Sequence, residues 1–260
     1  MSREQFVSAT SDGHVGIVTL DRASALNAIS GAMARELGAT FDRLTRDSGI
    51  WVVVVRAAGE RAFCVGADLK ERASFSLGDF YDNRRDVRAL FAAIRQVPQP
   101  TIAATFGFAL GGGFELALSC DLIVAAADST FGLPEVTVGL LPAGGGTQLL
   151  PRKIGAARAK ELIFTGRRVS AHEAHEMGFV ARVVSRDELD EASMDLARDI
   201  CSSSPVAVRE AKRAADAALG SIEAAIELED EAWGNVITSD DRAEGIAAFN
   251  EKRTPRWRNR

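Results

Sequence analysis

The sequence has few cysteines, and it shows neither a secretion signal nor an apolar run long enough to span a membrane. Its three cysteines, Cys64, Cys120 and Cys201, are odd in number and far apart, which fits a reduced intracellular protein. No apolar signal region follows the first methionine. The most apolar runs, at 51–55 and 116–127, are too short or interrupted to cross a bilayer. We therefore expect a cytoplasmic protein with no membrane partner.

The chain also has no excess of positive charge, because 31 Lys and Arg stand against 36 Asp and Glu, for a formal net charge of −5. Nucleic-acid binding needs a broad positive field, and the chain has no such excess. One basic stretch, from Lys252 to Arg260, closes the sequence, and we interpret its last four or five residues as a solvated tail. No nucleic-acid partner is expected.

Histidine is too rare and too scattered to predict a metal site. His172 and His175 flank Glu173, but a zincin motif needs two residues between the glutamate and the second histidine, and here there is one. The third histidine, His14, is remote in sequence. We expect 172–175 to form a solvated helix face and predict no metal ligands.

Strand and helix patterns alternate through most of the chain, which predicts an α/β fold. Consecutive apolar residues at 51–55 predict a strand covered on both faces. The other strands are expected at 15–20, 101–105 and 122–126, with helices at 30–46, where Ser30 is a candidate cap, and 79–96. From about residue 187 only helices are predicted, at 187–203, 205–219, 221–237 and 240–251, the last capped by Ser239.

The densest chemical signal is the glycine-rich segment 107–115, which follows a strand and opens into an apolar helix. Three consecutive glycines allow close backbone approach, and amides at a helix start can stabilise a developing oxyanion. Glu115 lies three residues after Gly112, on the same side of the first turn. By itself the segment favours a tight turn with close helix packing, and it matches neither a P-loop nor a dinucleotide-binding motif.

Two other segments are ambiguous in the same way. Glu135 stands among apolar residues, which tends to raise a carboxyl pKa toward neutrality, but it could also cap a surface turn after Pro134. A second glycine cluster follows at 144–146. The segment 61–72 occupies the strand-to-helix position of an α/β ligand site, or is an ordinary connection.

Taken together, these segments resemble the crotonase superfamily of enoyl-CoA hydratases and isomerases over nearly the whole chain. The resembling segments occur in this order: 26–28, 63–70, 107–115, 131–146, 165–166, 174–178, 240–242 and 249–253. The resemblance implies a crotonase (ClpP-like) spiral of β-β-α repeats over 1–190. It also implies a C-terminal helical trimerisation region over 191–260, and a homotrimer or a hexamer of two trimers.

The resemblance also implies roles for individual residues. Ala67 and Gly112 would supply the two oxyanion-hole amides, and an acyl-CoA thioester would be the substrate. The coenzyme A contacts would come from these residues: Ala25, Leu26, Val65, Ala67, Asp68, Leu69, Lys70 and Gly112. Phe249 and Lys252 would reach the coenzyme A of a neighbouring protomer. Coenzyme A is part of the substrate, and no separate cofactor is implied.

Glu115 and Glu135 match the two catalytic glutamates of enoyl-CoA hydratases. Glu115 would act as the base while water attacks the β-carbon, and Glu135 would protonate the α-carbon. The resemblance favours an enoyl-CoA hydratase of fatty acid or branched-chain acyl-CoA metabolism. The alternatives are a Δ3-Δ2 isomerase, a methylglutaconyl-CoA hydratase and a non-catalytic acyl-CoA binding protein. Acyl specificity is expected from 71–85, 131–142 and the C-terminal helices.

Overall fold

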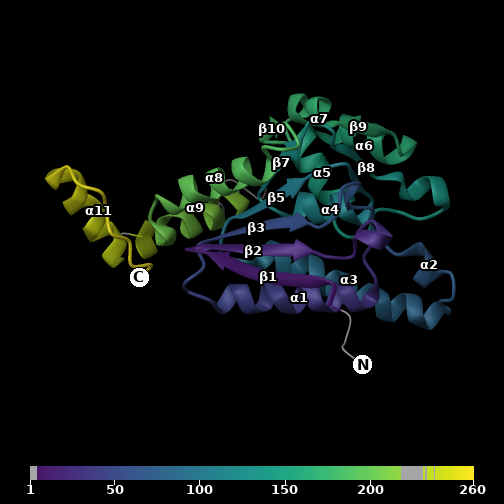
Figure 1. Cartoon of the computed structure of the whole chain (residues 1–260), viewed down its shortest axis with the longest axis horizontal. Helices are drawn as coiled ribbons and strands as arrows, with labels where there is room; N and C mark the ends of the chain where they lie inside the picture. Colours follow the sequence, from purple (N-terminus) through teal and green to yellow (C-terminus); the bar gives the residue numbers. More distant parts are fainter. Residues whose placement is uncertain (1–4, 218–230, 232, 237) are drawn as a thin grey trace.

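Two mostly parallel β-sheets organise the chain (Figure 1), and the computed structural model describes residues 5–217, 231, 233–236 and 238–260. The strands of the larger sheet, in spatial order, are β1 (Val7–Asp12), β2 (Val15–Leu20), β3 (Val52–Ala57), β5 (Thr101–Thr105), β7 (Leu122–Ala126) and β10 (Arg182–Val184). Those of the smaller sheet are β4 (Ala62–Cys64), β6 (Phe108–Leu110), β8 (Thr130–Gly132) and β9 (Arg168–Ser170). Among the strand pairs of the described residues, β1–β2 and β8–β9 are antiparallel and the others are parallel.

Successive turns of the chain repeat one pattern. The first strand of each turn joins the larger sheet and the second joins the smaller one, as in β3 and β4, β5 and β6, and β7 and β8. Each strand pairs in parallel with its counterpart in the next turn. The chain is therefore a spiral of β-β-α repeats, which confirms the expected α/β class and crotonase-type architecture.

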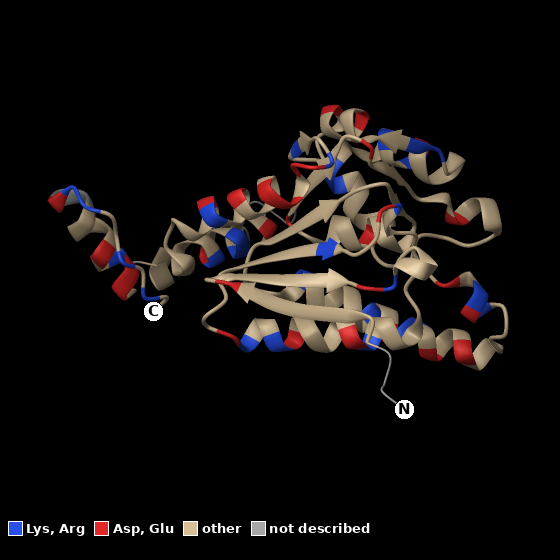
Figure 2. Cartoon of the chain, viewed as in Figure 1, with Lys and Arg blue, Asp and Glu red and all other residues tan. Residues whose placement is uncertain are grey.

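Both faces of the larger sheet are covered, as the apolar run at 51–55 predicted. On one face, Val53 and Val55 of β3 join the cluster built with α1 (Gly31–Arg46) and α3 (Leu77–Gln96). On the other, Val52 and Val54 join the cluster that contains residues of α8 (Leu189–Cys201). Figure 2 shows that acidic and basic residues are interspersed on the outer helices, while the central strands carry few.

The helix boundaries follow from their caps. The Ser30 hydroxyl accepts a hydrogen bond from Met33 N at 3.2 Å, so α1 begins where expected. α3 begins two residues before the predicted start at 79, because Ser76 and Asp79 form a reciprocal capping box. Before α3 comes the short helix α2 (Leu69–Arg72). The remaining short elements are α4 (Gly112–Ser119), α5 (Gly146–Ile154), α6 (Ala156–Thr165), α7 (Ala171–Met177) and the 3-10 helices η1 (Ala23–Ala25) and η2 (Pro134–Val138).

The C-terminal part contains α8, α9 (Pro205–Ala217) and α11 (Asp240–Glu251). The helix predicted at 221–237 lies largely outside the described residues. Ser239 caps α11 as expected, by accepting a hydrogen bond from Arg242 N. α8 packs on the larger sheet, whereas α11 lies at the end of the molecule opposite α2 (Figure 1). The division of the chain at residue 190 stays a prediction.

The basic tail is only partly the solvated segment that its charge suggested. The side chain of Arg258 is exposed, but its backbone amide donates to the buried carboxylate of Asp241 at 2.6 Å. Trp257 Nε1 donates to Ser202 O at 2.8 Å. The tail is therefore docked through its backbone and Trp257. Among the described helices, none combines the length and apolar character that a bilayer crossing requires.

Asn27 holds together the loop between β2 and α1, and its side chain is fully buried. Its Oδ1 accepts from Arg22 N at 2.8 Å, and its Nδ2 donates to Ala58 O and Ala62 O, both at 3.0 Å. Asn27→Ala leaves these backbone groups without partners. We expect a loss of about 1–3 kcal/mol in unfolding free energy, measured by urea denaturation. An unchanged urea midpoint would contradict this structural role.

Candidate active site

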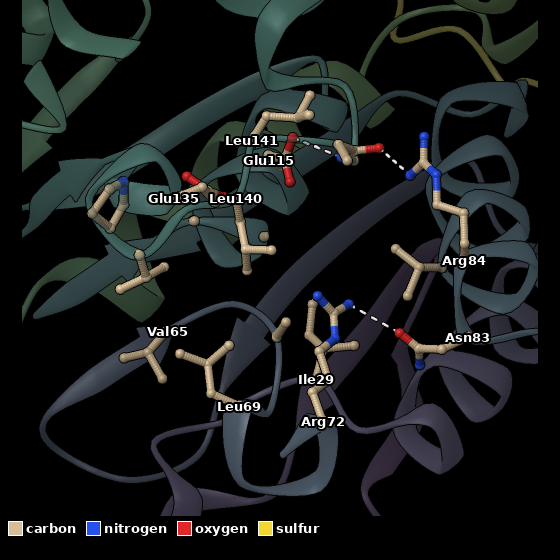
Figure 3. Close-up of a pocket in the computed structure, with 18 of the residues that line it drawn as sticks. Ile29, Val65, Leu69, Arg72, Asn83, Arg84, Glu115, Glu135, Leu140 and Leu141 are labelled. Carbon is tan, nitrogen blue, oxygen red and sulfur yellow. Dashed lines mark hydrogen bonds between the residues drawn. The ribbon is translucent and has the colours of Figure 1, made fainter. Parts of the chain in front are cut away.

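A cavity of about 550 Å³ lies between the N-terminus of α4, the loop after η2, and helices α2 and α3 (Figure 3). Two of the three regions expected to shape an acyl pocket, 71–85 and 131–142, supply much of its wall. The described C-terminal helices contribute no lining residue to the cavity of their own chain. The apolar part of the wall is formed by Ile29, Val65, Leu69, Phe80, Val87, Phe91, Val138, Leu140 and Leu141.

Two loops meet at one end of this cavity through their glycines. A Cβ placed on Gly66 would lie 2.8 Å from Gly112 N, and Gly66 has φ +89°. Only glycine combines that backbone conformation with such close approach. The contact brings the predicted oxyanion residues Ala67 and Gly112 together on the cavity wall.

The amides of Ala67 and Gly112 are free to bind a ligand. Across the described part of the chain, neither N–H donates a hydrogen bond. Gly112 is the first residue of α4, so its amide also lies at the positive end of a helix dipole. The pair therefore offers two unengaged donors to an oxygen atom in the cavity.

Glu115 projects from α4 into the same cavity and is only 3% exposed. Its Oε1 accepts hydrogen bonds from Gly144 N at 2.7 Å and Gly146 N at 2.8 Å. Burial raises the pKa of Glu115, and the amides of Gly146 and Gly144 offset part of that rise. The carboxylate is thus held in one orientation while its other oxygen remains available.

The second glycine cluster, at 144–146, leaves the space that the Glu115 side chain occupies. A Cβ on Gly144 would lie 2.3 Å from the ring of Phe91 and 2.7 Å from Glu115 Oε2. A Cβ on Gly146 would lie 3.0 Å from Glu115 Oε1. The sequence indicated the cluster but not its partner, because the two segments are 29 residues apart at their nearest hydrogen bond.

Glu135 lies in η2, half-buried, and lines the cavity with Glu115 (Figure 3). Its Oε2 is buried and has no hydrogen-bond partner among the described residues. Burial raises the pKa of Glu135 to about 7, its own backbone amide lowers it, and the charge of Glu115 raises it further. This upward direction is the one that its apolar surroundings predicted. Such a carboxyl can carry and release a proton near pH 7.

A second groove, of about 1260 Å³, adjoins the cavity and shares Val65, Ala67 and Leu69 with it. It is lined by the predicted coenzyme A contacts Ala25, Leu26, Val65, Ala67, Asp68, Leu69 and Lys70. Separate parts of the sequence therefore line two adjoining hollows that meet at Val65, Ala67 and Leu69.

Asp68 has a supporting position in this groove. Its Oδ1 caps α2 by accepting from Lys70 N and Glu71 N, and its Oδ2 forms a 2.6 Å ion pair with Arg22. Burial raises the pKa of Asp68, but Arg22 and the two amides outweigh burial, so the net shift is downward. Lys70 is exposed at the groove edge.

Lys252, one of the two predicted contacts at the C-terminus, does not line this cavity. It is exposed and follows α11, and α11 lies far from α2 in Figure 1. Phe249 belongs to α11, but its side chain lies outside the described residues. Their action on a neighbouring protomer stays a prediction.

His172 and His175 of α7 are both exposed, which agrees with the solvated helix face expected at 172–175. Within the described ranges, no three His, Cys, Asp or Glu side chains gather as metal ligands. The cavity also contains residues that the sequence did not single out, among them Asn83, Arg84, Val87 and Phe91 of α3. Their helical spacing in 79–96 indicated a buried face but gave no direction toward a ligand.

Known proteins are similar to this chain in sequence and in architecture. The model of the family described as "Enoyl-CoA hydratase/isomerase" matches residues 10–260. A human enoyl-CoA hydratase domain-containing protein 2, mitochondrial, is 44% identical over 245 residues, covering 92% of this chain and 84% of the human protein. Human methylglutaconyl-CoA hydratase, mitochondrial, is 39% identical over 250 residues, covering 94% of this chain and 74% of that protein. The crystal structure of an enoyl-CoA hydratase from Bacillus anthracis is 42% identical, with a TM-score of 0.96 over 98% of this chain and 100% of that one.

Proposed function

Since the chain belongs to the enoyl-CoA hydratase/isomerase family, we infer that it is a hydro-lyase that adds water across a trans-2-enoyl-CoA to give a 3-hydroxyacyl-CoA. Relatives and solved structures named enoyl-CoA hydratase cover most of the chain at about 40% identity. The single observation that carries the proposal for the site is that two carboxyls, Glu115 and Glu135, share one cavity with two free amides.

In this proposal the thioester carbonyl oxygen accepts hydrogen bonds from the amides of Ala67 and Gly112. Attack on the β-carbon moves negative charge onto that oxygen, so the amides bind the enolate more strongly than the substrate. Loss of one well-placed donor in such a site typically lowers the rate about 10²- to 10³-fold. The coenzyme A portion lies along the adjoining groove past Val65 and Leu69.

The two carboxyls have different environments, which suits opposite roles. Two backbone amides stabilise charge on Glu115, so it acts as the base and takes a proton from the attacking water. Glu135, with a pKa of about 7 and an unpartnered oxygen, carries the proton that it delivers to the α-carbon. Each turnover leaves Glu115 protonated and Glu135 ionised, and exchange with solvent restores both.

The direct test is loss of the enoyl thioester's ultraviolet absorbance with crotonyl-, decenoyl- and 3-methylglutaconyl-CoA. Turnover of any of them supports the proposal, and their order ranks the acyl chains. If all three bind without hydration while a 3-enoyl-CoA is converted to its 2-enoyl isomer, the protein is an isomerase. Binding without any turnover would leave only an acyl-CoA binding role.

The pH dependence of hydration follows from the two carboxyls. Glu115 must be ionised, so kcat/KM rises with pH on the acid side, and Glu135 must be protonated, so it falls as pH increases through about 7. We expect a bell-shaped profile, whose limbs report the coupled pair. Glu176→Gln, an exposed residue of α7, should leave it unchanged. A profile that is flat through neutral pH, with chemistry rate-limiting, would contradict these roles.

We also propose that the protein works in the cytoplasm, in fatty acid or branched-chain acyl-CoA metabolism, as a trimer or a hexamer of two trimers. The supporting observation is that Lys252 does not line the cavity of its own chain, and that the preceding helix α11 lies at the opposite end of the molecule from α2 in Figure 1. Sedimentation of the full chain would test this, and a monomer at working concentration would refute it.

A further inference from the structure

Two arginines of α3 contact the loop that holds Glu115. Arg84 Nη1 donates a hydrogen bond to Ala143 O, and Arg95 Nη1 donates to Gly144 O at 3.4 Å. About three helical turns separate the two arginines, so both project from the same face of α3. This face of the helix therefore lies against the carbonyl side of the loop.

The first of these contacts is made to a peptide group whose other end faces Glu115. Ala143 O and Gly144 N belong to the same peptide group, and in a trans peptide the C=O and the N–H point in opposite directions. Gly144 N donates to Glu115 Oε1 at 2.7 Å. Figure 3 shows the resulting row of hydrogen bonds, from Arg84 through the loop to Glu115. One peptide group thus connects a guanidinium to the carboxylate of the proposed base.

The next peptide group repeats the arrangement. Gly144 O, which accepts from Arg95, and Gly145 N belong to one peptide group. Burial raises the pKa of Glu115, and the amide of Gly145 and the charge of Arg84 are among the influences that lower it again. Hydrogen bonds in such rows polarise one another, so a cation at the carbonyl end strengthens the donor at the N–H end.

Charged side chains from η2, α2 and α3 act on Glu115 across the cavity. Glu135 of η2 opposes its ionisation, whereas Arg72 of α2 and the two arginines of α3 favour it. Arg72 donates to a side-chain amide of α3 and lies apart from the loop contacts. Among the described cations that act on Glu115, Arg84 and Arg95 are the ones that also hydrogen-bond the loop.

The acidic residues of α3 do not neutralise these two arginines. Asp86 pairs with Arg35 at 2.6 Å, and Asp82 pairs with Arg85 at 2.7 Å. Asp79 belongs to the capping box at the start of the helix. The donors and the charges of both arginines are therefore available to the loop.

We propose that Arg84 and Arg95 are positioning residues for hydration, which fix Glu115 and stabilise its negative charge through two peptide groups of the loop 143–145. The inference rests on the proposed hydratase function, because it concerns how the base of that reaction is held. A base must be ionised and correctly oriented before it can take a proton from water. The amides orient the carboxylate, and the arginines supply positive charge that offsets part of its burial.

The test is the pH profile of crotonyl-CoA hydration in Arg84→Met and Arg95→Met. Methionine keeps an unbranched side chain but removes the charge and the donors. Loss of a cation raises the pKa of Glu115, so the acid limb of kcat/KM should move to higher pH. We expect kcat at neutral pH to decrease roughly 3- to 10-fold in each variant, since both arginines are exposed, and roughly 10- to 100-fold in the double variant. The Kd for butyryl-CoA should change little.

Two further variants separate charge from structural support. Arg84→Lys keeps a cation and a donor, so it should return the acid limb to the wild-type pH and recover most of kcat. Arg85→Met is the matched control, because Arg85 neighbours Arg84 on α3, is 79% exposed, pairs with Asp82 and does not line the cavity. It should leave the profile unchanged. A decrease in kcat without movement of the acid limb, or identical profiles for Arg84→Lys and Arg84→Met, would overturn the inference.

A measurement without turnover distinguishes this inference from the hydratase proposal. In infrared difference spectra against Glu115→Gln, the band of the protonated carboxyl reports the ionisation of Glu115 as pH varies. A titration that moves to higher pH in Arg84→Met would support the positioning role even if no enoyl thioester were hydrated, an outcome that would refute the hydratase proposal alone. An identical titration in the wild-type protein and in the double variant would refute the positioning role and leave the hydratase function intact.

Discussion

Glu115→Gln and Glu135→Gln are each expected to lower kcat for crotonyl-CoA hydration by about 10²- to 10⁴-fold, the usual contribution of a positioned acid or base. Glutamine keeps the shape of the side chain but cannot exchange a proton. In Glu115→Gln the amide oxygen can still accept from Gly144 N and Gly146 N, so the loop should keep its conformation. The loss should therefore appear in kcat, while the Kd for butyryl-CoA changes little.

The measurement is steady-state hydration beside calorimetric binding of butyryl-CoA for both variants. Glu176→Gln, on an exposed face of α7, is the matched control and should retain full activity. Near-native turnover by either cavity variant would show that the assigned residue does not transfer the proton. A parallel loss of binding would instead indicate a structural role.

The second large effect is expected at Gly66, which carries no reactive group. A Cβ there would lie 2.8 Å from Gly112 N and 2.9 Å from Leu110 O, so Gly66→Ala must move the two loops apart. This displaces the amides of Ala67 and Gly112 from a common oxygen. We expect kcat to decrease roughly 10²- to 10³-fold, comparable to removal of an oxyanion-hole donor.

The contribution of backbone strain can be measured separately. Gly178 has nearly the same conformation, φ +93° against φ +89° for Gly66, but a Cβ on it meets nothing within 4 Å. Gly178→Ala should therefore reproduce the strain of a positive φ without moving the site. If the two variants lost the same stability and the same activity, the contact between the glycine loops would not matter for catalysis.

Local patterns were sufficient to predict the central strands of the larger sheet and the first long helix. β2, β5 and β7 begin and end where their apolar runs do, and α1 begins at its Ser30 cap. The strands of the smaller sheet were not predicted, because each has only three residues and gains its stability from pairing with the turns before and after it. The start of α3 was predicted two residues too late, because its cap residue Ser76 lies outside the apolar periodicity that indicated the helix.

The sequence by itself determined which groups are chemically available: two carboxyls in apolar surroundings, two glycine clusters, and a chain without metal-ligand spacing. Only the tertiary structure decided how these groups act on one another. The amides of Gly144 and Gly146 hold Glu115, and the close approach of Gly66 to Gly112 brings two amides to the same cavity. Hydrogen bonds and charges act over a few ångströms in space, and the spiral places side by side segments that local sequence patterns treat as independent.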